Sequence, residues 1–147
     1  MCWDCDNPDG DYLAHLRGII DSHGWAVQGV EGDGVHPPWA YTVGLTPRGK
    51  PELVVTGMPF QGAAGLLNVI APETVQAGER IELGEALLIE VVELAVPSAH
   101  LHVAVGLYGP EVRALQLVHA DLHGRWPWER GYRGVRGGQP VLGVRDQ

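Results

Sequence analysis

Cysteine is scarce in this sequence of 147 residues: there are two, Cys2 and Cys5, and both lie at the very start. Two cysteines are too few for the disulfide framework of a small secreted protein. No apolar run approaches the roughly 20 residues of a membrane-spanning helix. The first residues are acidic and contain no apolar segment of the kind found in a signal peptide. We therefore expect a cytoplasmic protein with reduced thiols and no membrane partner.

Positive charge is also in short supply, because 10 Lys and Arg residues face 18 Asp and Glu residues, giving a net charge of −8. This balance argues against nucleic-acid binding, which needs a positive surface. The deficit is uneven, since residues 1–33 are acidic with Arg17 as their basic residue, whereas residues 125–147 are rich in arginine. Two interpretations are open: the two regions neutralise each other, or the basic region binds a small anionic ligand.

The sequence lacks the common catalytic motifs. It contains no nucleophile elbow, P-loop, dinucleotide fingerprint or H-E-x-x-H motif. Its two serines, Ser22 and Ser98, have no local signature of a catalytic triad. Hydrolase chemistry is therefore disfavoured, and whether the protein is an enzyme stays open.

Apolar residues make up 45% of the chain, enough for a folded core. Their spacing predicts helices where they recur every three or four residues and strands where they alternate or cluster. The expected helices are 11–23 and 60–70, and the expected strands are 25–30, 39–45, 52–57, one or two within 78–96, and 114–121. Residues 101–108 fit either a strand or a helix. We predict one α+β domain over 1–147, with a mostly antiparallel or split-barrel-like sheet, two or three helices, an extension (1–10) and an irregular tail (124–147).

The spacing of Cys2 and Cys5, C-x-x-C, suits two ligands of a tetrahedral zinc ion. The other ligands would be histidines or a carboxylate, and His100 and His102 are the best candidates because a strand over 101–108 would point both imidazoles to one face. A redox pair is a second interpretation, although the aspartates flanking the cysteines would raise the thiol pKa and so oppose it. A third is that both thiols are idle.

Polar residues near the end of the last strand form a second candidate cluster. Asp121 lies between His119 and His123, where its carboxylate could orient an imidazole. An aspartate before a glycine also commonly makes a turn, which is the alternative interpretation.

The tail holds a third candidate site, built from Trp126, Trp128, Arg130 and Arg133. Tryptophans can wall a pocket, and arginines among glycines can bind a phosphate or stack on a flat ring. The alternative is a lid over the core, with its arginines facing the acidic N-terminal helix.

Several short blocks occur in one order along the chain, including "GWAVQGV", "WAYTVGL", "GKPELVVTGMP", "ALQLVHAD", "GRWPWERG" and "QPVLG". Together, over about residues 24–143, they resemble a bacterial family known as domain of unknown function 4262, with "MCWDCD" marking a subgroup. The hairpin and following helix are loosely similar to flavin-binding split barrels. That likeness would place a ligand near Tyr41 and Thr42, with the segment Trp126–Arg136 closing over it. Besides a zinc- or ligand-binding domain, this likeness leaves open a flavin-dependent oxidoreductase. A third hypothesis is an interaction protein that forms a homodimer through exposed aromatic surface.

Overall fold

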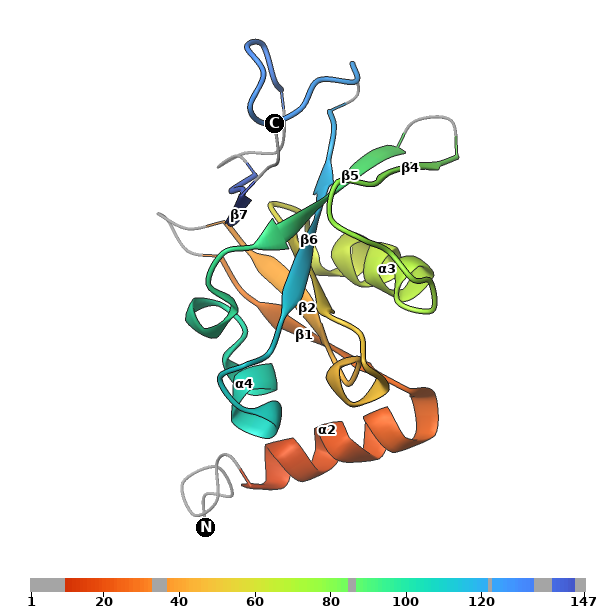
Figure 1. The fold of residues 1–147 in the computed structure, drawn as a ribbon, viewed down its shortest axis with the longest axis vertical. Helices are drawn as coiled ribbons and strands as arrows, with labels where there is room; N and C mark the ends of the chain where they lie inside the picture. The colour runs from red at the N-terminus through yellow and green to blue at the C-terminus, as the bar shows by residue number, and fades with distance from the viewer. Residues whose placement is uncertain (1–9, 33–36, 85–86, 122, 134–138, 145–147) are drawn as a thin grey trace.

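The computed structural model describes residues 10–32, 37–84, 87–121, 123–133 and 139–144. Its strands form one open sheet in the order β1-β2-β3-β6-β5-β4, and β7 pairs with β5 beside this path (Figure 1). The bounds are β1 (Ala26–Val30), β2 (Trp39–Val43), β3 (Glu52–Thr56), β4 (Arg80–Leu83), β5 (Leu87–Leu94), β6 (Ala114–His119) and β7 (Gly143–Val144). All pairs are antiparallel except β3 with β6. The described residues thus confirm an α+β fold, with a sheet that is open rather than closed into a barrel.

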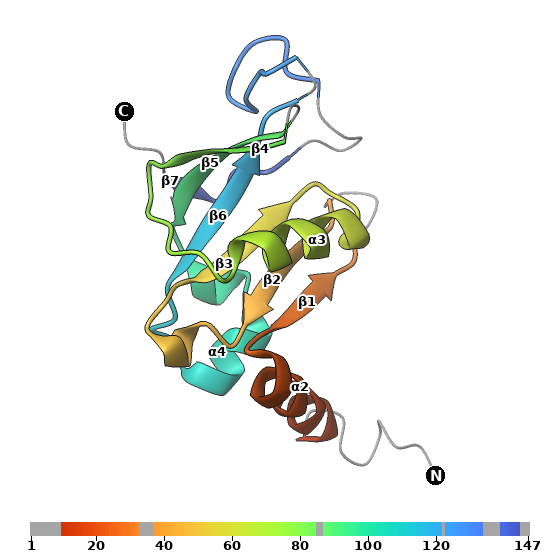
Figure 2. The same cartoon turned by 90° about the vertical axis from the view of Figure 1, so that its right-hand side faces the viewer.

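Three helices pack around this sheet in the described part of the chain: α2 (Gly10–His23), α3 (Phe60–Ile70) and α4 (His102–Tyr108). Two 3₁₀ turns, η1 (Thr46–Arg48) and η2 (Pro97–Ala99), lie in the connections. Helix α3 covers one face of the sheet, α4 lies on the other, and α2 crosses one end (Figures 1 and 2). Sequence spacing predicted α2 and α3 closely, because both carry the apolar stripe of a half-buried helix.

Helix α3 is held against the sheet by its apolar face. Its buried residues are Ala63, Leu66, Leu67 and Ile70, and they pack on alternate residues of β3, β5 and β6.

The C-terminus of α3 is close to a lysine. The Nζ atom of Lys50 lies 3.2–3.4 Å from three carbonyl oxygens just beyond the helix, those of Ala71, Pro72 and Glu73. A cation at this position offsets the partial negative charge of a helix C-terminus.

Residues 102–108 form a helix, α4, which is the second of the two structures that the sequence left open. Leu101 and Ala104, three residues apart, are both fully buried, and this spacing suits a helix rather than a strand. The N–H of Val103 donates to the Tyr41 hydroxyl at 3.0 Å. Because the first amides of a helix have no partner within it, this hydroxyl caps α4.

The acidic and basic parts of the chain are far apart in the described structure. Helix α2 and residues 123–133 lie at opposite ends of the long axis (Figure 1). The arginines of 123–133 therefore do not face the N-terminal helix, and their charge is available for another partner. Among the residues described, no helix is both long and apolar enough to cross a membrane.

Candidate functional site

The two histidines predicted to complete a metal site lie where η2 meets α4. His102 is exposed, and its Nε2 atom lies 3.1 Å from the carbonyl oxygen of Ala99. A carbonyl can only accept, so Nε2 carries the hydrogen and Nδ1 of a neutral ring keeps the lone pair. The side chain of His102 is therefore arranged as a metal-ligating histidine commonly is, with one ring nitrogen bound to a backbone oxygen.

His100 is more enclosed than His102. Its ring meets that of Trp39 edge-on, with 6.4 Å between centroids, and the indole Nε1 of Trp39 donates to the His100 carbonyl at 3.2 Å. Burial, and secondly the charge of His102, lowers the pKa of His100. Cys2 and Cys5 lie outside the described residues, within which no three His, Cys, Asp or Glu side chains gather as a metal site.

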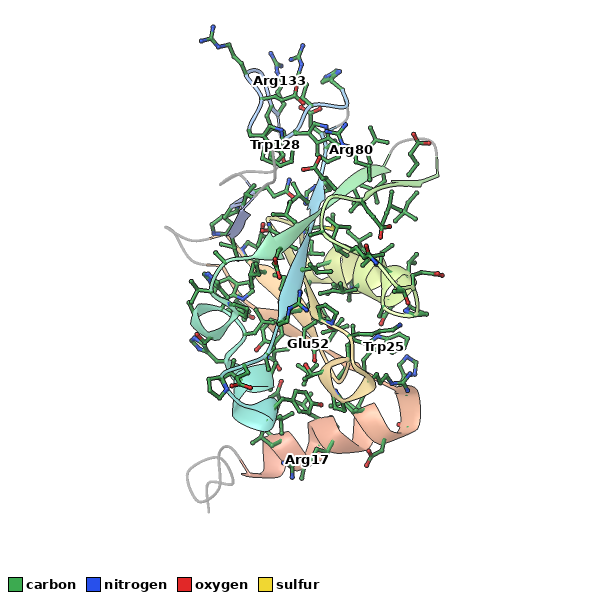
Figure 3. The ribbon with its side chains drawn as sticks, in the orientation of Figure 1. Arg17, Trp25, Glu52, Arg80, Trp128 and Arg133 are labelled. Atoms are coloured by element: carbon green, nitrogen blue, oxygen red, sulfur yellow. The ribbon has the colours of Figure 1, made fainter. Side chains whose placement is uncertain are left out.

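Tyr41 and Thr42, predicted to contact a cofactor, are buried inside the fold. Burial raises the pKa of Tyr41 to about 12 although the backbone of Val103 opposes the shift. The Thr42 hydroxyl donates to Glu52 at 2.8 Å and accepts from the amide of Leu53 at 2.9 Å. Figure 3 shows Trp128 and Arg133 at the far end of the molecule from Glu52. The structure thus does not bring Tyr41 and Thr42 together with the predicted residues of the tail.

Glu52 is the most constrained side chain near Thr42, and the sequence analysis did not single it out. Its side chain is fully buried and accepts five hydrogen bonds of 2.6–3.3 Å. They come from the Thr42 hydroxyl, the amides of Gly44, Leu45 and Thr46, and the Thr46 hydroxyl. Because Glu52 opens β3, it fixes the turn after β2 to the next strand of the hairpin. A carboxylate at the head of the apolar run "ELVV" was the available signal.

At the opposite end of the sheet, Asp121 organises the residues that follow β6. Its carboxylate accepts backbone N–H bonds from His123, Arg125 and Arg133 at 2.7–2.9 Å. Burial would raise the pKa of Asp121, but these three amides, assisted by the charge of His123, outweigh it and hold the pKa below its usual value. Asp121 thus makes a turn rather than orienting an imidazole.

Residues 123–133, which we call the arginine loop, are anchored by tryptophan. Trp126 is 6% exposed and packs with Val92 and Val118 on the sheet. Its ring stacks on that of Trp128, with centroids 5.5 Å apart and planes within 4°. The guanidinium of Arg80 lies 5.0 Å from the Trp126 ring centroid. Part of the tail therefore belongs to the core, as the lid interpretation expected.

The guanidinium groups of the arginine loop have a different environment. Arg125, Arg130 and Arg133 are all exposed, and Arg125 donates to the carbonyl of Gly131 at 3.2 Å. Glu129, the loop's own acidic residue, accepts from the amide of Trp126 at 3.1 Å. No ion pair is formed by these three arginines within the described residues. The loop therefore presents positive charge on a protein that is otherwise acidic.

Two buried glutamines attach the C-terminal segment to β6, and the sequence analysis did not anticipate them. Gln116 donates to the carbonyl of Pro140 and accepts from the amide of Leu142, both at 2.7 Å. Gln139 exchanges two hydrogen bonds of 2.7 and 2.9 Å with the backbone of His119. A polar residue inside the apolar run "ALQLV" was the signal for Gln116.

His119 is buried as a neutral imidazole. Its Nε2 atom lies 3.2 Å from the carbonyl of Thr56 and so carries the hydrogen. Burial lowers the pKa of His119, and the contact with Thr56 only partly opposes this. Because its pKa in the folded state is below the unfolded value of about 6.5, stability is full above that pH and declines as the pH falls through the folded-state pKa.

We expect His119→Gln to flatten this pH dependence, because the glutamine amide can still donate to Thr56 but does not titrate. The measurement is the urea midpoint at about pH 7.5 and about pH 5.5, on either side of the unfolded-state histidine pKa. His100 affects the pH dependence of stability in the same direction in the wild type and in His119→Gln. The difference between the two proteins therefore reports on His119. The exposed His15→Gln serves as control and should lose as much stability on acidification as the wild type. If His119→Gln shows the same difference between its two urea midpoints as the wild type, His119 is not a source of the pH dependence.

The fold and these two ends define an open-sheet α+β domain with a buried carboxylate at one end and an arginine-rich loop at the other. The chain belongs to the family described as "Domain of unknown function (DUF4262)", whose profile matches residues 19–133. The resemblance noted in the sequence is thereby confirmed, while "QPVLG" at 139–143 and the C-x-x-C motif fall outside the matched residues. No curated protein and no solved structure matches the chain.

Proposed function

We propose that this protein is a small-ligand-binding domain and that the arginine loop binds a ligand bearing a phosphate group. The observation that carries the proposal is that the carboxylates here bind backbone amides rather than arginines. The carboxylates of Glu129 in the loop and of Asp121 just before it accept hydrogen bonds from backbone amides. Arg130 and Arg133 are exposed and have no acidic partner among the described residues.

The same contacts support the geometry of recognition. The loop backbone is fixed by the three N–H hydrogen bonds to Asp121 and by the stacking of Trp126 on Trp128. Less conformational freedom is therefore lost when a ligand binds. A guanidinium presents a planar pair of donors that matches two oxygens of a phosphate. The partly exposed Trp128 lies within the loop and provides a fluorescent reporter of binding.

The test is titration calorimetry with inorganic phosphate, adenosine monophosphate and flavin mononucleotide, with adenosine and riboflavin as partners that lack phosphate. We expect a phosphate-bearing probe to bind and its phosphate-free partner to bind much more weakly. Arg130→Gln and Arg133→Gln should each weaken binding about tenfold or more, since a charge-assisted hydrogen bond contributes about 1.5–3 kcal/mol.

Arg113→Gln is the matched control, because it removes the same charge from an exposed arginine that pairs with Glu93 on another part of the surface. It should bind like the wild type. The proposal fails if none of the three phosphate-bearing probes binds at millimolar concentration, or if the loop variants and Arg113→Gln behave alike. Binding of flavin mononucleotide in preference to the other probes would favour the flavin-dependent alternative.

A second candidate function is zinc binding by Cys2 and Cys5 with His102, and with His100 as a further ligand. The observation that favours it is the bond from His102 Nε2–H to Ala99, which leaves the Nδ1 lone pair of an exposed ring for a metal. Zinc with two thiolates and two imidazoles is a common structural site that would attach the N-terminus to the body of the domain.

Elemental analysis of protein purified without chelators tests this candidate. We expect about one equivalent of zinc in the wild type, none in Cys2→Ser/Cys5→Ser, and less in His102→Asn. His15→Gln, which removes an exposed histidine from α2, should keep the metal. A metal-free wild type whose two thiols react freely would refute the zinc site.

A further inference from the structure

A cavity lies at the opposite end of the domain from the arginine loop, between α2, η1 and α4. Its volume is about 300 Å³, and its lining includes Arg17, Asp21, Arg48 and Tyr108. This volume is at the lower end of the range typical of small-molecule sites. The cavity is independent of the phosphate site proposed above, because Arg17 and Arg133 lie at opposite ends of the molecule (Figure 3).

Two arginines from different elements reach this cavity. Arg17 comes from α2, and Arg48 closes η1 with its guanidinium against Gly24, where a Cβ atom would lie 2.8 Å from Nη2. Within the described residues neither side chain forms an ion pair. Gly24 and Gly44 also line the cavity, so bare backbone forms part of its wall.

The cavity is bipolar rather than uniformly positive. Asp21 contributes a carboxylate, and the last turn of α2, with its partial negative charge, ends beside Gly24. A compact dianion such as phosphate would meet repulsion from this side. A ligand with one negative and one positive group would satisfy both sides.

The remaining walls are apolar, with one phenol. Ile20, Pro47 and Leu107 line the space with aliphatic carbon, and the half-buried residue Tyr108 adds a phenol. Burial, followed by the charge of Glu52, raises the pKa of Tyr108, so its hydroxyl stays protonated and can donate to a carboxylate. Apolar walls between opposite charges suit a ligand whose charged groups share one carbon and whose side chain is apolar.

We propose that this cavity binds a free α-amino acid with an apolar side chain. Arg17 and Arg48 bind its carboxylate as a guanidinium pair, Asp21 binds its ammonium group, and the side chain lies against Ile20 and Leu107. The site needs no contribution from the arginine loop.

The test is a calorimetric titration with each of the twenty standard L-amino acids, followed by the des-amino analogue of the best binder and by inorganic phosphate. We expect an apolar amino acid to bind at least about tenfold more tightly than its des-amino analogue, because the analogue leaves Asp21 unpaired. Arg48→Gln should weaken binding by a similar factor, whereas Arg113→Gln should not. Arg133→Gln should leave amino-acid binding intact, which separates this site from the phosphate site.

Asp21→Asn provides the sharper variant, because it lies on the exposed side of a helix and should fold normally. We expect it to reduce amino-acid affinity to that of the des-amino analogue while leaving the analogue's own affinity the same or better. The proposal is overturned if no amino acid binds at millimolar concentration, or if Asp21→Asn weakens the amino acid and its analogue equally.

Discussion

Glu52→Gln is expected to lower the free energy of unfolding by about 3–5 kcal/mol, the cost typical of removing one partner from a buried charged network. The carboxylate is the acceptor in all five of its hydrogen bonds, three of which come from backbone amides of the turn at 44–46. A glutamine of the same shape would turn an NH₂ group toward these donors. Buried amides would then lose their acceptor, and the measurement is urea unfolding followed by circular dichroism.

The control for this variant is Glu93→Gln. Glu93 pairs with Arg113 at 2.9 Å, but their side chains are 53% and 70% exposed. Exposed pairs of this kind contribute about 0–1 kcal/mol, so the control should unfold almost like the wild type. Equal effects in the two variants would show that the buried carboxylate does not organise the turn.

Gly44→Ala is expected to destabilise the protein by about 2–4 kcal/mol, since two separate costs coincide at this residue. Its φ of +125° is rarely adopted by residues with a side chain. A Cβ atom there would also lie 3.0 Å from the Gly24 carbonyl oxygen and 3.0 Å from Trp25 Cα. Both neighbours are backbone atoms, so the contact cannot be relieved by rotating a side chain.

Gly49→Ala separates the two costs. Gly49 has a φ of +78°, but a Cβ atom there would meet nothing within 4 Å. This variant should therefore carry the conformational cost alone, about 1–2 kcal/mol. If urea unfolding shows equal losses for both alanine variants, the close approach of the backbone at Gly24 and Trp25 is not what requires glycine at residue 44.

The local pattern of the sequence was sufficient for most of the elements. Periodic apolar residues placed α2 and α3, and alternation or apolar runs placed the strands, because these signals depend only on neighbours in the chain. Residues 101–108 stayed ambiguous because their alternation fits a strand, and the helix depends on Tyr41 capping it from β2. The parallel pairing of β3 with β6 likewise depends on a crossover that no local pattern records.

The candidate sites were harder to predict for the same reason. The sequence placed Trp126, Trp128, Arg130 and Arg133 in one segment, and the structure keeps them in one loop. It could not show that Asp121 and Glu129 bind backbone amides, which depends on how the loop folds back. Nor could it bring Arg17 of α2 to the same cavity as Arg48, because the cavity arises from the packing of α2 against the end of the sheet.

The most direct test of the phosphate-binding proposal is the NMR spectrum of the indole N–H groups during titration with the tightest binder among inorganic phosphate, adenosine monophosphate and flavin mononucleotide. Trp25 and Trp39 provide internal references, because their Nε1 atoms donate to Asn68 and to the His100 carbonyl, away from the arginine loop. We expect the Trp128 resonance to shift saturably while those of Trp25 and Trp39 stay in place. A spectrum in which Trp128 does not move, or in which Trp25 or Trp39 moves instead, would contradict it.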